Sequence, residues 1–324
     1  MDDTRQNWPR ISIVTPSYNQ GIYLEDCIQS ILDQKYPDLE YFIIDGGSND
    51  DSLQIIRKYA SHLSGWVSEP DQGQSDAINK GLKQANGDLV AWLNADDYYL
   101  PGALQEIAQA YLQNPEAPFY FGDGLRVDEK KIHSKNFFPE GIVSFDRSAL
   151  IHGLNYILQP ATFIRRAALE KAGYLDMNLH YGMDTDLWIR LSADAEPVPV
   201  QAVLAASREH SSTKTATGSF KRLEELRLVA EKHSGKPITP GFLCYFLDTL
   251  ERYTREHEEE YPDSYHKMLA AFWTATANLL AQYHARPDGF PIQPQASQKL
   301  TGSHRLTLMM RLRKLLTTSF LKKD

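Results

Sequence analysis

The chain of 324 residues is poor in cysteine, with only Cys27 and Cys244. The two lie far apart among apolar neighbours, without the spacing of a metal site. We therefore expect buried free thiols in a reducing cytosol rather than a disulfide. No apolar run approaches the roughly 20 residues of a membrane-spanning helix. The N-terminal "MDDTRQNWPR" also lacks the basic-then-apolar order of a signal peptide, so we expect a cytoplasmic protein.

Basic residues are not in excess, since the formal net charge is −8. A general nucleic-acid-binding protein would carry a basic surface, so we expect no nucleic-acid partner. Glycine fingerprints are also missing. The first apolar run, "ISIVT", is followed by "PSYNQG". This is neither a dinucleotide-binding motif nor a phosphate-binding P-loop.

The first hundred residues alternate short strand-like and helix-like stretches. The runs 11–15, 41–45 and 89–93 are rich in apolar residues and read as strands, and helical spacing lies between them. Parallel strands need crossover connections, so this alternation predicts an α/β fold with a mainly parallel sheet and helices on both faces.

Polar clusters follow the predicted strands, at 15–19, 45–50 and 94–97. In open α/β sheets ligands bind beyond the carboxyl ends of the strands. Adjacent carboxylates at Asp96 and Asp97 repel each other, and a bound cation relieves that repulsion. The sequence therefore predicts a crevice for a nucleotide-sized ligand and a cation. A solvated turn that caps the helix after Pro101 is the simpler alternative.

Four stretches, in order, resemble glycosyltransferase family 2, the inverting enzymes with the Rossmann-like GT-A fold. They are "ISIVTPSYNQGIYLEDCIQSIL", "FIIDGGSNDDS", "EPDQGQSDAINKGLKQANGDLVAWLNADD" and "YYLPGAL". The resemblance covers about residues 10–215. It implies a GT-A domain over 1–216, with a nucleotide-sugar half at 10–110 and an acceptor half at 111–216.

The resemblance implies a donor site at the strand ends, for a UDP-sugar or an equivalent. Asp45 falls where the family contacts the donor base, and Pro16 and Tyr18 help to enclose that base. Gly46 replaces the second acid of the family's usual Asp-Asp-Gly-Ser. The expected donor-binding residues are Thr15, Pro16, Tyr18, Asp45, Asp71, Asn94 and Ala95.

The family's Asp-X-Asp element maps onto Asn94-Ala95-Asp96. The resemblance assigns the first position to the ribose, where asparagine can still bond a hydroxyl, and the last to Mn²⁺ or Mg²⁺. Asp97 is expected to help. A histidine followed by serine after the catalytic domain completes the metal site in related enzymes, which points to His210. Such hard ions need few protein ligands when substrate phosphates supply the others.

The general base of the family maps onto Asp184, and the glutamate that usually precedes it is Met183 here. An inverting transfer needs one carboxylate beside the attacking hydroxyl. Asp186 is expected on the acceptor side, as support for the helix that begins there, together with Gln159. The alternative is that both aspartates only stabilise a helix N-terminus.

These residues together predict a metal-dependent, inverting hexosyltransferase. It would move a sugar to a hydroxyl of a saccharide or lipid-linked acceptor, in polysaccharide or glycolipid assembly of the cell envelope. A sugar nucleotidyltransferase and a non-catalytic nucleotide-sugar-binding scaffold are the alternatives. A phosphate-binding glycine-rich loop would favour the first, and loss of Asp96 or Asp184 would favour the second. The sequence does not identify the sugar, the acceptor or the oligomeric state.

Residues 217–324 are predicted to be a helical accessory region without a chemical motif. Its end, 303–324, combines an apolar stripe with basic flanks. Two interpretations stay open: this helix docks on the domain, or it attaches the protein to the anionic inner face of a membrane.

Overall fold

The computed structural model describes residues 8–138 and 141–256. The predicted basic helix at 303–324 lies outside these residues. The described part forms two units. The first runs up to Phe145 and resumes at Tyr156–Thr217, and the second combines Asp146–Asn155 with the residues from Gly218 onward.

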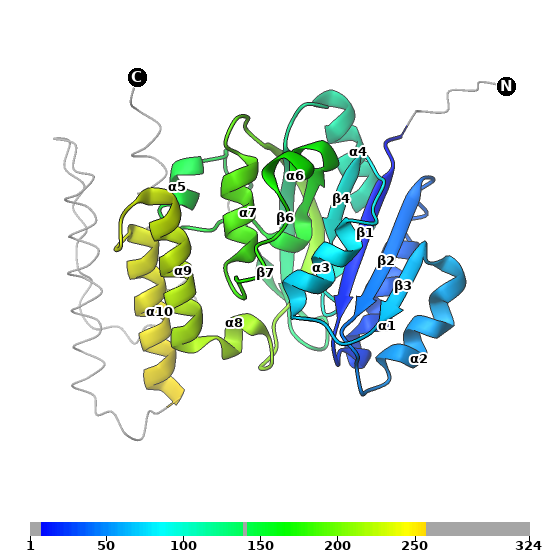
Figure 1. Cartoon of the computed structure of the whole chain (residues 1–324), viewed down its shortest axis with the longest axis horizontal. Coiled ribbons are helices and arrows are strands. Elements are labelled where there is room, and N and C mark those ends of the chain that lie inside the picture. The colour runs from blue at the N-terminus through cyan, green and yellow to red at the C-terminus, as the bar shows by residue number, and fades with distance from the viewer. Residues whose placement is uncertain (1–7, 139–140, 257–324) are drawn as a thin grey trace. The chain divides into compact units, whose positions relative to one another are not determined.

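A nine-stranded sheet with the order β3-β2-β1-β4-β8-β6-β9-β5 organises the first unit, and β7 pairs with β6 beside it. The strands β3, β2, β1 and β4 lie side by side in Figure 1. The bounds are β1 (Ile11–Ser17), β2 (Leu39–Asp45), β3 (Gly65–Ser68), β4 (Leu89–Trp92), β5 (Tyr98–Tyr99), β6 (Phe119–Val127), β7 (His133–Asn136), β8 (Thr162–Arg165) and β9 (Val198–Arg208).

The first four strands pair in parallel, as the alternation of strands and helices predicts. The second half of the sheet is mixed. β8 runs antiparallel to both β4 and β6, and β5 runs antiparallel to β9, whereas β6 and β9 are parallel. The predicted GT-A-like α/β architecture is confirmed, with a parallel nucleotide half and a mixed second half.

Helices cover both faces of the sheet because side chains alternate between the faces along each strand. Ile11 and Ile13 share one core with the apolar sides of α1 (Gly21–Leu32), α2 (Ser52–Tyr59) and α4 (Ala103–Gln113). Val14, the residue after Ile13, faces α3 (Gln74–Leu82) instead, where a Cβ on Gly81 would lie 2.4 Å from the valine.

On the same face as α3, α7 (Met183–Leu191) stacks Trp188 on Trp92 of β4, with 5.6 Å between ring centroids. These aromatic rings are fully buried and fix the start of α7 relative to the end of β4. Two short 3₁₀ helices and two short α-helices complete the unit: η1 (Ala60–His62), η2 (Gln159–Ala161), α6 (Arg166–Ala172) and α8 (Lys214–Thr217).

The second unit is helical, as predicted, and contains α5 (Arg147–Ile151), α9 (Ser219–Ser234) and α10 (Pro240–Glu256). Its boundary after Thr217 lies one residue beyond the predicted one. The segment Asp146–Asn155, which the sequence placed in the acceptor half, clusters with these helices. Gly241 donates its amide to His152 O at 3.0 Å, and a Cβ on Gly241 would lie 2.2 Å from the Gly153 carbonyl carbon. Because Gly153 and Gly241 have no side chains, the backbone after α5 and the backbone of the first turn of α10 can come into direct contact.

Both cysteines are buried free thiols, as predicted. Burial raises the pKa of the Cys27 thiol to about 12, so it stays protonated and packs as an apolar group. Within the described residues, no helix has both the length and the hydropathy needed to cross a bilayer.

Candidate active site

The loops after β1 and β2 are joined by hydrogen bonds at the carboxyl edge of the sheet. Gly46 donates its amide to Ser17 O at 2.8 Å. Asn19 donates its amide to Ser48 Oγ and accepts the Asn49 amide on its own Oδ1, both at 2.8 Å. Asn19 adopts φ 52°, a left-handed conformation that asparagine tolerates. The two predicted donor loops therefore form one rigid surface.

Asp45, the expected base-binding acid, is fully buried at the end of β2. Its Oδ2 accepts the amides of Gly47 at 3.2 Å and Ser48 at 3.0 Å, and the Ser68 hydroxyl at 2.7 Å. Its Oδ1 accepts the Ser48 hydroxyl. This carboxylate holds the turn after β2 and the end of β3 together.

Three of the expected donor-binding residues lie at the end of β1 or just after it, and they differ in exposure. Thr15 is fully buried and its hydroxyl lies 3.0 Å from Tyr41 OH, so it faces the core. Pro16 is buried in the strand. Tyr18, in contrast, is 60% exposed. Of these three, Tyr18 has the surface needed to stack on a base.

Asn94 lies at the centre of a side-chain network just after β4. Its Oδ1 accepts Gln74 Nε2 at 2.7 Å, and its Nδ2 lies 3.2 Å from Gln159 Oε1 and 3.4 Å from Asp97 Oδ2. Gln159 is itself anchored, since its Nε2 donates to Trp92 O at 2.8 Å. An aspartate at position 94 would lose both amide donors and set its charge beside Asp97. The network thus accounts for asparagine where the family commonly has aspartate.

Asn94→Asp is expected to lower the free energy of unfolding by about 1–3 kcal/mol, because it leaves buried acceptors without their donor. Urea unfolding followed by circular dichroism measures this change. Asn49→Asp, which adds the same charge at an exposed position, is the control and should unfold like wild type. Equal stability of the two variants would contradict the network as described.

Asp96 and His210 meet although they are far apart in the sequence. Asp96 Oδ2 lies 3.1 Å from His210 Nε2, and His210 Nδ1 lies 2.8 Å from Ser212 Oγ. The histidine is largely buried and packs on Tyr23, with 4.9 Å between ring centroids. Ala95, between Asn94 and Asp96, is also buried.

This pair fits a divalent cation that shares substrate oxygens. A carboxylate oxygen and an imidazole nitrogen are both ligands of Mn²⁺, and a histidine that binds metal has its other nitrogen hydrogen-bonded, as Ser212 allows here. Within the described residues no cluster of three or more acidic, histidine or cysteine side chains forms a metal site. An ion at Asp96 and His210 would therefore depend on oxygens of the substrate and water.

Asp97 is buried and bonded to the protein backbone. It is 4% exposed, and its Oδ1 accepts the Arg208 amide at 3.0 Å. Burial, and then the charge of Asp96, raise the pKa of Asp97 well above its usual range. The helix that follows is not capped by either acid, because its N-cap is Gly102 and no side chain bonds the cap. Pro101 directly precedes this cap.

Arg208, which the sequence analysis missed, lies at the end of β9 and binds the loop that carries Asp96. Its Nε donates to Asp96 O at 3.0 Å and its Nη2 lies 3.3 Å from Asp26 Oδ2. Its guanidinium stands 4.5 Å from the centroid of Tyr23. The arginine is 4% exposed. The sequence around Arg208 contains no motif that predicts this role. Its partners lie on α1 and in the loop after β4, far away in the sequence.

The pKa of Asp26 reflects the same cluster. Burial alone would raise it, but hydrogen bonds from Lys131 and Arg208 outweigh burial and lower it. Lys131 Nζ lies 2.7 Å from Asp26 Oδ1. Asp26 is thus a charged anchor between α1 and the turn before β7.

Asp184 lies in the first turn of α7 and is partly exposed. Its Oδ1 accepts the Thr185 amide at 2.7 Å. Met183, in place of the family's glutamate, is buried and lies 2.8 Å from Ser75 Oγ through its sulfur. Because Ser75 adjoins Gln74, the start of α7 is held close to the Asn94 network.

Asp186, two residues on, differs from Asp184 in its surroundings. It is fully buried, and its Oδ2 accepts Arg190 Nε at 2.8 Å. Arg190 also donates to the carbonyls of Ala172, Gly173 and Tyr174. This arrangement ties α7 to the end of α6, in keeping with support of the helix.

Besides the contact of Ser75 with Met183, a second contact to the segment around the start of α7 comes from the residues after His210. Lys214 Nζ donates to His180 O at 3.1 Å, which joins the start of α8 to the loop before α7. The region of Asp96 and His210 is therefore connected to the start of α7 on two sides, through Ser75 and through Lys214.

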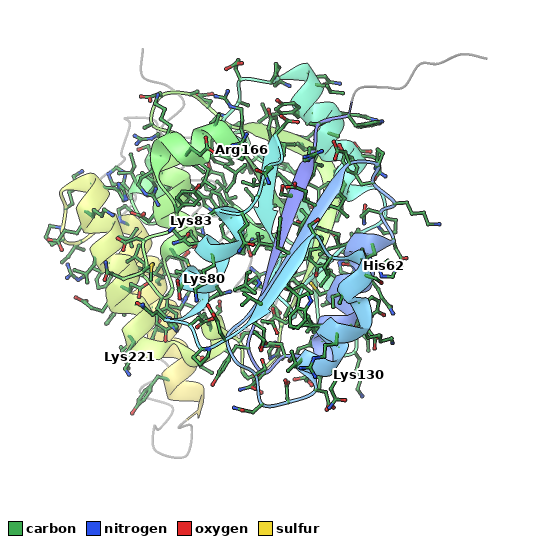
Figure 2. The ribbon with its side chains drawn as sticks, turned by 45° about the vertical axis from the view of Figure 1, so that its right-hand side comes forward. His62, Lys80, Lys83, Lys130, Arg166 and Lys221 are labelled. Carbon is green, nitrogen blue, oxygen red and sulfur yellow. The ribbon has the colours of Figure 1, made fainter. Side chains whose placement is uncertain are left out.

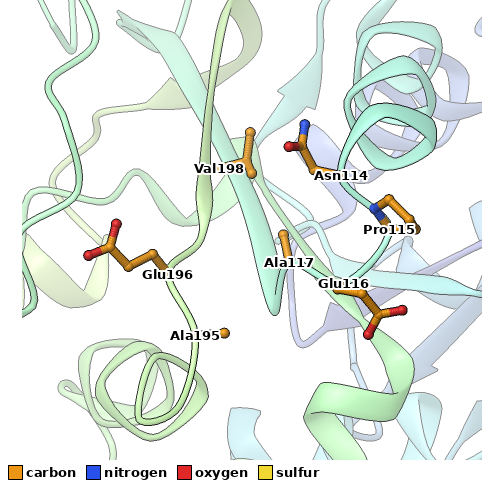
Figure 3. A pocket seen from close by; sticks show the side chains of 7 residues that line it. All are labelled: Asn114, Pro115, Glu116, Ala117, Ala195, Glu196 and Val198. Atoms are coloured by element: carbon orange, nitrogen blue, oxygen red, sulfur yellow. The ribbon is translucent and has the colours of Figure 1, made fainter.

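A shallow hollow of about 330 Å³ lies elsewhere, at the opposite end of the sheet (Figure 3). Its lining comes from the segments before β6 and β9 and contains Asn114, Pro115, Glu116, Ala117, Ala195, Glu196 and Val198. None of the residues of the candidate site takes part. This hollow is not the carboxyl-edge crevice that the sequence predicts.

Comparison with solved structures gives the fold. Staphylococcus aureus TarS, residues 1–349 in complex with UDP-GlcNAc, has a TM-score of 0.56 at 18% identity, covering 84% of this chain and 81% of that one. The mannosyltransferase PcManGT of Pyrobaculum calidifontis, in complex with GDP-Man and Mn²⁺, also has a TM-score of 0.56. It is 17% identical and covers 98% of this chain and 89% of that one.

Sequence relatives agree with the structures. An uncharacterized glycosyltransferase of Rickettsia typhi is 29% identical over 229 residues, 67% of this chain and 69% of that protein. One from Mycobacterium tuberculosis is 26% identical over 227 residues, 67% of this chain and 84% of that protein. The family model described as "Glycosyl transferase family 2" matches residues 12–173, half of the chain. The chain therefore belongs to glycosyltransferase family 2.

Proposed function

We propose that the protein transfers a sugar, with inversion and with the help of a divalent cation, from a nucleoside diphosphate sugar to a hydroxyl of a saccharide or lipid-linked saccharide. Family membership establishes a glycosyltransferase and sets aside the nucleotidyltransferase and scaffold alternatives. The observation that carries the finer proposal is the meeting of Asp96 and His210. Hydrogen bonds of Ser75 and Lys214 link the neighbouring segments to the start of α7, where Asp184 is partly exposed.

Each residue would have one task in this proposal. Asp184 takes the proton of the acceptor hydroxyl as its oxygen attacks the anomeric carbon. Asp96 and His210 would hold Mn²⁺ or Mg²⁺. A cation bound there would neutralise the charge of the departing diphosphate. Asn94, fixed by Gln74 and Gln159, stands where the donor ribose is expected.

The proposal draws support from the two structural neighbours. TarS was crystallised with UDP-GlcNAc, and PcManGT was studied with GDP-Man and Mn²⁺. Both donors are nucleoside diphosphate sugars, although their bases differ. The donor class is thus common to the two. Which base this chain recognises has to be inferred from its own residues.

A thermal-shift screen of nucleotide sugars tests the proposal. A UDP- or GDP-sugar at about 100 times its dissociation constant should stabilise the protein by about 2.7 kcal/mol, seen as a rise in Tm. The rise should require Mn²⁺ or Mg²⁺ and disappear with EDTA. If no nucleotide sugar stabilises the protein, the donor class is wrong. If EDTA makes no difference, the metal is not needed for donor binding.

A further inference from the structure

We propose that Asp71, rather than Asp45, supplies the carboxylate that recognises the donor base. We further propose that the site selects bases with a ring N–H, which are uracil, thymine and guanine. The inference rests on the proposed function and specifies the donor of that site. It follows from which carboxylate oxygens are still available at the carboxyl edge of β2 and β3.

Asp45 has little left to offer a ligand. One of its oxygens accepts three hydrogen bonds, the other accepts the Ser48 hydroxyl, and none of the residue is exposed. A carboxylate has about four lone-pair positions, so the protein itself takes up nearly all of them. Its position as a buried anchor explains why an acid is needed there without any contact to a nucleotide.

Asp71 is a nearby acid that has one carboxylate oxygen available to a ligand. It lies in the loop between β3 and α3 and is partly exposed. Its Oδ1 accepts the Gly73 amide at 2.8 Å, which fixes the orientation of the carboxylate. Within the described residues, its Oδ2 makes no hydrogen bond to the protein. That oxygen is therefore oriented by the loop and open to a donor from outside.

Gly46 makes room for this oxygen. A Cβ on Gly46 would lie 2.6 Å from Asp71 Oδ2, closer than such atoms approach each other. The backbone is not the reason for glycine at this position, because Gly46, unlike Gly47, does not have a positive φ. Any side chain at position 46 would push the Asp71 carboxylate away. Gly46 and Asp71 thus act as a pair that places one carboxylate beside the end of β2.

The carboxylate defines the chemistry of the base. A carboxylate group accepts hydrogen bonds and donates none. Uracil and thymine present a ring N–H between two carbonyls, and guanine presents a ring N–H beside an amino group. Cytosine and adenine present a ring nitrogen lone pair at the corresponding position, so only their amino group can donate to the carboxylate. The lone pair facing the carboxylate disfavours these two bases.

The test is calorimetric titration of UDP, GDP, CDP and ADP, with Mn²⁺, into wild type and three variants. We expect wild type to bind UDP or GDP at least about 10-fold more tightly than CDP and ADP. Asp71→Ala should weaken the preferred nucleotide about 10-fold or more and leave the others nearly unchanged. Glu69→Ala is the matched control in the same loop, since Glu69 pairs with Lys80 (Figure 2) at 3.1 Å and is mostly exposed. It should bind like wild type.

Gly46→Ala gives a second, independent route to the same effect. It should weaken the preferred nucleotide in the wild-type background and add little in the Asp71→Ala background, because the displaced group is then already missing. Equal losses for all four nucleotides, or wild-type binding by Asp71→Ala, would overturn the inference and leave the proposed function standing. If wild type binds no nucleoside diphosphate, both fail.

Discussion

Asp184→Asn should slow sugar transfer by about 10²–10⁴-fold while nucleotide-sugar binding stays at the wild-type level. The amide keeps the size of the side chain but cannot take a proton from the acceptor hydroxyl. Asp184 is partly exposed in the first turn of α7, and asparagine is common near helix N-termini, so we expect the variant to fold. Initial rates under saturating donor and acceptor, with calorimetric donor binding alongside, separate kcat from affinity.

The matched control for this variant is Asp194→Asn, beyond the other end of α7. Asp194 pairs with Lys171 at 2.8 Å, and both side chains are largely exposed. An exposed pair of this kind contributes little to stability, so activity and Tm should be near wild type. Turnover of Asp184→Asn within about three-fold of wild type would remove Asp184 from the mechanism, because a general base contributes far more.

Asp186 shows why both acids of α7 have to be compared. It is buried against Arg190, and Arg190 ties three carbonyls at the end of α6. Loss of that carboxylate removes the partner of a partly buried cation, which destabilises the fold. A loss of activity at either aspartate therefore has to be read together with Tm, and Asp186→Asn is expected to lower Tm more than Asp184→Asn.

Local patterns were enough to predict the parallel half of the fold. The strands β1, β2 and β4 are apolar runs with helical spacing between them, and their polar ends meet because parallel strands end at one edge. The positions of Asp96 and Asp184 on the fold could be predicted for the same reason, whereas their roles come from the family resemblance and stay predictions. Each directly follows or begins an element whose apolar pattern is visible in the sequence.

The second half could not be predicted because its partners are distant in sequence. β8 has four residues, and it is defined by pairing with β4 and β6 rather than by its own pattern. The segment Asp146–Asn155 clusters with helices that begin about 70 residues later, a contact no local spacing signals.

The same limit applies inside the site. Asn94 looked like a departure from the family pattern, but its amide joins Gln74, Gln159 and Asp97. Arg208 binds the loop of Asp96 and the helix of Asp26. Such roles depend on the three-dimensional arrangement of three or four elements, so sequence alone could assign only the residues that a motif contains.

Removal of either member of the Asp96 and His210 pair should cost most of the activity. We expect Asp96→Ala and His210→Ala each to lower kcat by about 10²-fold or more, because the charge of the leaving diphosphate is no longer neutralised. Mn²⁺ affinity, measured by electron paramagnetic resonance without donor, should fall in both. His62→Ala is the control, since His62 is an exposed histidine bonded only to Ser61 among the described residues.

The double variant distinguishes a metal site from an ion pair that merely stabilises the fold. If both side chains hold one cation, the second substitution should add little to the loss in Mn²⁺ affinity, so the effects are not additive. If the pair serves folding, Tm in EDTA should fall in the single variants while Mn²⁺ affinity stays at the wild-type level. The side chain of Asp96 is 19% exposed, and its one hydrogen bond to another side chain of the described residues is with His210. We therefore expect the Asp96 carboxylate to stabilise a bound ligand more than it stabilises the fold.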